Sequence, residues 1–74
     1  EEHVRILSFI NNQRKLGRDV TFKDIGKTFN ITAPTTQKKI RELEERGLLR
    51  VVKQGRNKLL EPTKEGSAIT PLNA

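Results

Sequence analysis

Hydroxyl, amide and basic side chains are concentrated in the segment TTQKKIR at residues 35–41. In the major groove of duplex DNA, glutamine can bond adenine, a threonine methyl can contact thymine, and lysine or arginine can reach guanine or a phosphate. The same residue types occur on ordinary solvated helix faces, so this segment alone leaves both interpretations open. The candidate contacts in it are Thr35, Thr36, Gln37, Lys38, Lys39 and Arg41.

A second basic segment, KQGRNK, occupies residues 53–58. Its Gly and Asn favour a turn, so the segment predicts a hairpin with a charged tip. Arg56 at that tip would reach a minor groove or the phosphates beside it, although a solvated tip is the alternative. Residues 33–58 hold eight basic and three acidic side chains, so the basic excess is concentrated here. The further candidate contacts are Lys53, Arg56, Asn57 and Lys58, with Lys23 and Lys27 as phosphate contacts.

Groups suited to catalysis do not converge anywhere in the sequence. His3 stands near the amino end without a second histidine or any cysteine, and a solvated residue is its expected state. Ser8 and Ser67 have no plausible base beside them, and the five glycines are too scattered to cradle a phosphate. Glu44 and Glu45 predict only surface ion pairs with neighbouring cations. We therefore expect no enzymatic activity, no metal and no cofactor.

The composition points to a small basic domain that binds a polyanion. The 74 residues carry 15 Lys and Arg against 9 Asp and Glu, a formal net charge of +6. Such an excess favours nucleic acid, and a salt- or heat-adapted surface is the alternative. No apolar run approaches the roughly 20 residues that cross a bilayer, so no membrane partner is expected.

The periodicity of apolar residues predicts helices that place these segments. Thr21 and Asp24 form a capping box, Thr32 with Pro34 starts the helix that carries residues 35–41, and Gly47 ends it. After Gly47 the pattern changes to that of strands, and Thr63 caps a last helical turn through Ser67. The predicted elements are helices at 2–16, 21–30 and 33–46, strands at 48–52 and 59–60, and a brief strand at Val20.

These elements predict an α+β fold that is mostly α. The architecture is a winged helix-turn-helix of three helices plus a two- or three-stranded β-hairpin wing. Helical spacing makes Val4, Leu7, Ile10 and Asn11 inward positions of the first helix. Thr36, Ile40 and Leu43 are the inward positions of the third helix, although Thr36 is also counted among the candidate contacts.

Two motifs resemble the DNA-binding lobe of the multiple-antibiotic-resistance-regulator (MarR) family and its archaeal relatives. LEERGL at residues 43–48 is similar to the end of that family's recognition helix, and PTKEG at residues 62–66 is similar to the L-T-x-x-G that follows its wing, with Pro for Leu. The resemblance covers about residues 4–66. It implies that Pro34, Thr35, Gln37 and Lys38 face the bases and that Arg56 is the wing arginine.

The resemblance also sets expectations for the domain and its partners. We predict a DNA-binding domain at residues 1–68 and a tail at 69–74, with helix 33–46 in the major groove and wing 53–58 on the minor groove or backbone. The partner is double-stranded DNA. A homodimer is one possible state, although the family's long dimerisation helices are missing from this sequence.

The leading interpretation is a cytoplasmic, nucleoid-associated transcription regulator that binds duplex DNA by sequence. A replication or partition protein could use the same winged helix to hold DNA with little sequence preference. A protein-interaction module that meets an acidic partner is the third alternative. Base-reading groups at the start of helix 33–46 favour the first, because binding to phosphates alone does not need them.

Overall fold

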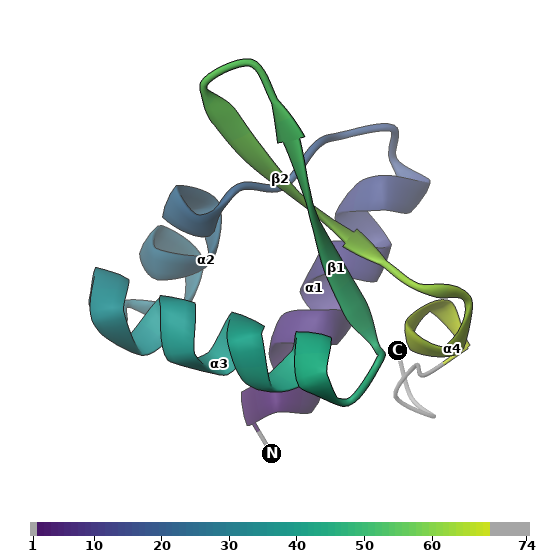
Figure 1. Cartoon of the computed structure of the whole chain (residues 1–74), viewed down its shortest axis with the longest axis horizontal. Helices are drawn as coiled ribbons and strands as arrows, with labels where there is room; N and C mark the ends of the chain where they lie inside the picture. The colour runs from purple at the N-terminus through teal and green to yellow at the C-terminus, as the bar shows by residue number, and fades with distance from the viewer. Residues whose placement is uncertain (1, 69–74) are drawn as a thin grey trace.

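The computed structural model describes residues 2–68 and confirms the predicted fold class (Figure 1). Three helices precede a two-stranded antiparallel hairpin, and a single helical turn follows it. The predicted tail at 69–74 lies outside the described residues. In chain order the elements are α1 (Glu2–Lys15), α2 (Phe22–Phe29), α3 (Ala33–Glu45), β1 (Leu49–Gln54), β2 (Asn57–Pro62) and α4 (Lys64–Ser67).

Local hydrogen bonds start α2 and α3 where the sequence predicts. The backbone amide of Asp24 donates to the Thr21 hydroxyl, and the Thr21 amide donates to the Asp24 carboxylate, which completes the capping box. The Thr32 hydroxyl accepts from the Thr35 amide, and Pro34 lies in the first turn of α3. The connection between α2 and α3 begins at Asn30, which has a left-handed φ of 54° at the end of α2, and ends at the Thr32 cap.

The end of α3 is a Schellman motif centred on Gly47. Gly47 has a φ of 72°, its amide donates to the Glu44 carbonyl, and the Leu48 amide donates to the Leu43 carbonyl. Glycine adopts this left-handed conformation at less cost than residues that carry a Cβ. The chain therefore leaves α3 sharply and enters β1 at Leu49.

The core lies where α1, α2, α3 and the base of the hairpin meet. The ring of Phe9 packs edge-on against Phe29, with centroids 5.8 Å apart, beside this core. Val4 was predicted to be buried and is not, since 37% of it is exposed. The buried face of α1 is centred on Ile6 and its neighbours, and Val4 lies at the edge of that face. The buried apolar residues are Ile6, Leu7, Ile10, Val20, Ile25, Ile40, Leu43, Leu49 and Leu60.

The hairpin is longer and its loop shorter than predicted. Gln54 pairs with Asn57, so only Gly55 and Arg56 form the loop. The φ of 64° at Gly55, the first loop residue, is typical of a type II′ turn, which suits the twist of a hairpin. The strand predicted at Val20 reduces to a single bridge between Thr21 and Leu59, beside a 2.8 Å bond from the Leu60 amide to the Val20 carbonyl.

The segment after the hairpin fastens it to the helices. The Thr63 hydroxyl donates to the Gly47 carbonyl at 2.6 Å and accepts from the Gly66 amide. Asn11, buried as predicted, donates its side-chain amide to the Gly66 carbonyl. Gly66 is buried because α4 packs directly on the backbone of Leu48. The PTKEG motif therefore joins the end of α3, the base of the hairpin and the middle of α1.

None of the helices within residues 2–68 is both long and apolar enough to cross a membrane.

Candidate nucleic-acid interface

Helix α3 exposes most of the polar and basic side chains that the sequence singles out. Ile40 and Leu43 are buried, and this fixes the rotation of the helix against the core. The opposite side of the helix therefore does not pack against the core. The exposed candidates on α3 are Thr35, Gln37, Lys38 and Arg41.

Two candidates on α3 do not belong to this exposed surface. Thr36 is 1% exposed, and its hydroxyl donates to the Thr32 carbonyl at 2.9 Å. Its inclusion as a DNA contact was wrong, because the helical spacing that buries Ile40 also buries Thr36. Lys39 turns toward α1, where its ammonium lies 2.9 Å from the Glu2 carboxylate. Its charge is therefore paired on the side of α3 next to α1, and not on the exposed side of the helix.

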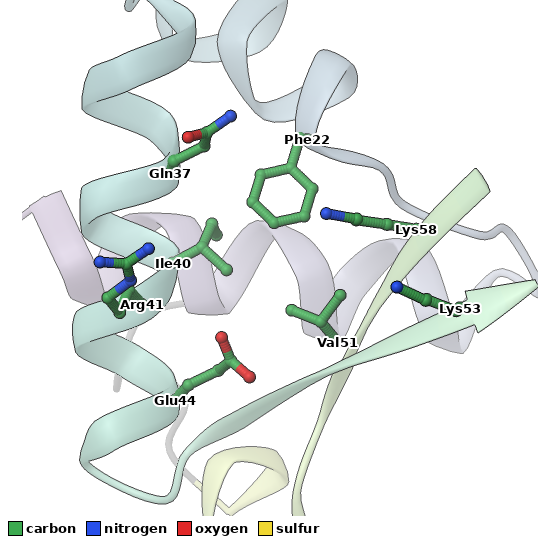
Figure 2. Close-up of a pocket in the computed structure, with 8 residues that line it drawn as sticks. All are labelled: Phe22, Gln37, Ile40, Arg41, Glu44, Val51, Lys53 and Lys58. Carbon is green, nitrogen blue, oxygen red and sulfur yellow. The ribbon is translucent and has the colours of Figure 1, made fainter. Parts of the chain in front are cut away.

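A groove separates α3 from the hairpin and holds four of the predicted site residues (Figure 2). Gln37 and Arg41 line it from α3, and the side chains of Lys53 and Lys58 extend toward α3 from β1 and β2. The volume of the groove is about 620 Å³. Cations from α3 and from both strands of the hairpin therefore line one concave surface.

Apolar side chains and one carboxylate complete the groove. Phe22 from α2, Ile40 from α3 and Val51 from β1 line it. Glu44, one turn after Arg41 on α3, also lines it. Neither Phe22 nor Glu44 was predicted to be a site residue. The signal for Glu44 was its spacing of seven residues from Gln37, which returns to nearly the same side of a helix.

The lysines of α2 border a second, more open cleft. Lys23 and Lys27 line it together with Phe22 and Gln37, and its volume is about 580 Å³. Both lysines are exposed. They are thus placed beside the start of α3, which lines the same cleft.

Arg56 and Asn57 lie apart from both clefts. They occupy the exposed end of the hairpin, which projects away from α3 (Figure 1). The two-residue loop places Arg56 at the end of the hairpin. The candidate interface therefore has three parts, which are the exposed side of α3, the groove and the hairpin tip.

An unpredicted pair of polar contacts ties the start of α1 to α3. His3 Nε2 lies 2.7 Å from Glu42 Oε1, so the expectation of a solvated His3 was wrong. The hydrogen bond with His3 is the main cause that lowers the pKa of the Glu42 carboxyl. The bond from Lys39 lowers the pKa of Glu2 in the same way. These contacts hold the first turn of α1 against the side of α3 that faces away from the groove.

The sequence matches the family model of the MarR family over residues 2–58. No curated protein sequence matches the chain closely enough to be counted as a relative.

Several solved structures share the fold. MepR, a transcription regulator of the multidrug efflux pump MepA of Staphylococcus aureus, is 24% identical, with a TM-score of 0.85 over 93% of this chain and 50% of MepR. A MepR–DNA complex is also 24% identical, with a TM-score of 0.80 over 90% of this chain and 49% of MepR. AF1382 from Archaeoglobus fulgidus is 25% identical, with a TM-score of 0.83 over 90% of this chain and 74% of AF1382. The chain thus spans about half the length of MepR.

Proposed function

The chain belongs to the MarR family, and on that premise we propose that it is the DNA-binding lobe of a transcription regulator that binds double-stranded DNA by sequence. In this proposal α3 enters the major groove with its amino-terminal half. Thr35, Gln37 and Lys38 meet base edges there, and Pro34 approaches them. Arg56 at the hairpin tip reaches the minor groove or the backbone.

The observation that carries the proposal is the convergence of α3 and the hairpin on one cationic surface. Arg41, Lys53 and Lys58 line the same groove, and Gln37 stands beside them. Lysine and arginine side chains supply the phosphate contacts that fix a protein on DNA, whereas amide groups can distinguish bases. The surface therefore offers both kinds of group within one concave face.

Two further facts support DNA as the partner. The net charge of +6 on 74 residues favours association with a polyanion. MepR, which has the same fold, has been solved in complex with DNA.

We also propose that the protein is cytoplasmic and nucleoid-associated and has no enzymatic activity. A homodimer on a paired site is part of the proposal too, because helix-turn-helix dimers bind half-sites about one helical turn apart.

The test compares Gln37→Ala with Lys27→Ala on two DNAs. A duplex selected from a random pool and an unselected duplex of equal length are titrated at one salt concentration, with fluorescence anisotropy as the readout. If Gln37 bonds a base, its loss costs about 1–3 kcal/mol on the selected duplex and little on the other. Lys27 is placed to meet a phosphate, so Lys27→Ala should weaken the complexes with both duplexes by the same factor.

The outcomes separate this function from its alternatives. Equal losses on both duplexes for Gln37→Ala would favour the replication or partition protein that binds with little sequence preference. Absence of binding by the parent protein to any duplex at low salt would remove DNA as the partner and favour a protein-interaction module. The sedimentation of the complex with the selected duplex gives the number of copies bound.

A further inference from the structure

The groove between α3 and the hairpin contains an excess of positive charge and one carboxylate. Arg41, Lys53 and Lys58 are its cations, and Glu44 is its one acidic lining residue among those that the structure describes. A role for this carboxylate rests on the proposed function, because it concerns how strongly the groove holds the DNA backbone.

The two lysines lie next to each other on the hairpin side of the groove. Lys53 and Lys58 are directly paired across β1 and β2, so their side chains leave the same face of the hairpin. Cβ atoms of such pairs lie about 4.5–5.5 Å apart, and like charges there destabilise a sheet. In the part of the chain that the structure covers, neither lysine makes an ion pair. A phosphate between them would relieve the repulsion.

Helix stability does not explain the position of Glu44. It lies in the last turn of α3, where the carbonyl end of the helix disfavours negative charge. No ion pair links its carboxylate to a cation within residues 2–68, although Arg41 is one turn away on the same helix. Figure 2 shows the carboxylate directed into the groove, on the side of Val51. Glu44 is therefore a solvent-exposed charge that faces the path of the DNA.

We propose that Glu44 limits the affinity of this groove for the DNA backbone. A phosphate that enters the groove is attracted by Arg41, Lys53 and Lys58 and repelled by Glu44. Phosphate contacts alone supply essentially all binding to random DNA. Repulsion from Glu44 weakens this part of the interaction, so that tight binding depends on the base contacts of α3.

The test is Glu44→Gln, with Glu65→Gln as the matched control. Both changes raise the net charge by one, and glutamine is as good a helix former as glutamate. Glu65 is exposed on α4 and does not line the groove. Binding of each variant to a random-sequence duplex is measured by fluorescence anisotropy over a series of salt concentrations, and thermal melts establish that both variants are folded.

Glu44→Gln should lower the dissociation constant for random duplex by about three- to tenfold at low salt, the size expected for one charge near one or two phosphates across water. Glu65→Gln should change it by less than about twofold, because its charge is screened over a longer distance. An equal effect of the two variants, or weaker binding by Glu44→Gln, would overturn the inference while leaving the proposed function intact. Failure of the parent protein to bind any duplex would instead overturn the proposed function, and the inference with it.

Discussion

Replacing Gly66 with alanine tests how the hairpin is fastened to the helices. A Cβ at this position would lie 1.8 Å from the carbonyl oxygen of Leu48 and 2.8 Å from its carbonyl carbon. To bring the shorter contact to 3.0 Å, α4 and the base of β1 would have to separate by roughly 1.2 Å, a backbone shift of the kind that overpacking imposes. The atoms in contact belong to the backbone, so a change of side-chain rotamer cannot relieve the clash.

The expected cost follows from this clash and from the bonds nearby. Overpacking of this kind destabilises a protein by about 1–3 kcal/mol. The shift of α4 also disturbs the bond from the Asn11 side chain to the Gly66 carbonyl, which is 3.1 Å long in the parent. In a helix without the clash, Gly→Ala would instead stabilise by about 0.4–1 kcal/mol. The sign of the change is therefore diagnostic.

Thermal unfolding followed by circular dichroism measures this cost. For a domain of this length, each kcal/mol corresponds to about 4–8 °C, so Gly66→Ala should melt about 5–20 °C below the parent. Lys64→Ala, at an exposed position on the same short helix, is the control and should melt near the parent temperature. A melting temperature for Gly66→Ala at or above that of the parent would refute the proposed packing of α4 on Leu48.

Two other substitutions address the interface and the contact between α1 and α3. Arg56→Ala should weaken DNA binding and reduce the slope of log affinity against log salt by about one, because one charge contact with the DNA is lost; an unchanged slope would show that the hairpin tip does not contact DNA. For Glu42, the hydrogen bond with His3 lowers the folded-state pKa from 4.5, so the ionised carboxylate in this bond stabilises the protein above that pH and stops doing so as the pH falls through the folded-state value. The melting temperature of Glu42→Gln should therefore lie below that of the parent at neutral pH and converge with it in acid, and a constant difference across this range would contradict the assignment.

Local chemistry made the ends of the helices predictable. Thr21 with Asp24, Thr32 and Gly47 act through hydrogen bonds within a few residues, and the structure has each of them as predicted. The inward positions of α3 were also correct, because the burial of Ile40 and Leu43 follows from helical spacing alone.

Contacts between distant segments were not predictable. His3 meets Glu42 across 39 residues, and Lys39 meets Glu2, so their partners depend on how α1 crosses α3. The register of the two strands was not predictable either. Whether Lys53 and Lys58 belong to the loop or to the strands depends on the turn at Gly55. The backbone conformation of the structure was needed to show that this turn has only two residues.

The hairpin has neighbours along only half of its length, and this sets how its backbone exchanges with solvent. Near the base, Leu49 and Leu60 are buried, and the Leu60 amide is bonded to Val20 outside the hairpin. Toward the tip, the strands pair only with each other and every residue from Lys53 to Lys58 is exposed. Opening the tip therefore exposes little apolar surface, whereas opening the base requires the core to separate. Amide hydrogen exchange should become faster from Leu60 toward Asn57. If the tip binds DNA as proposed, the ordering of these outer residues is an entropy cost that the contacts of Arg56 have to exceed.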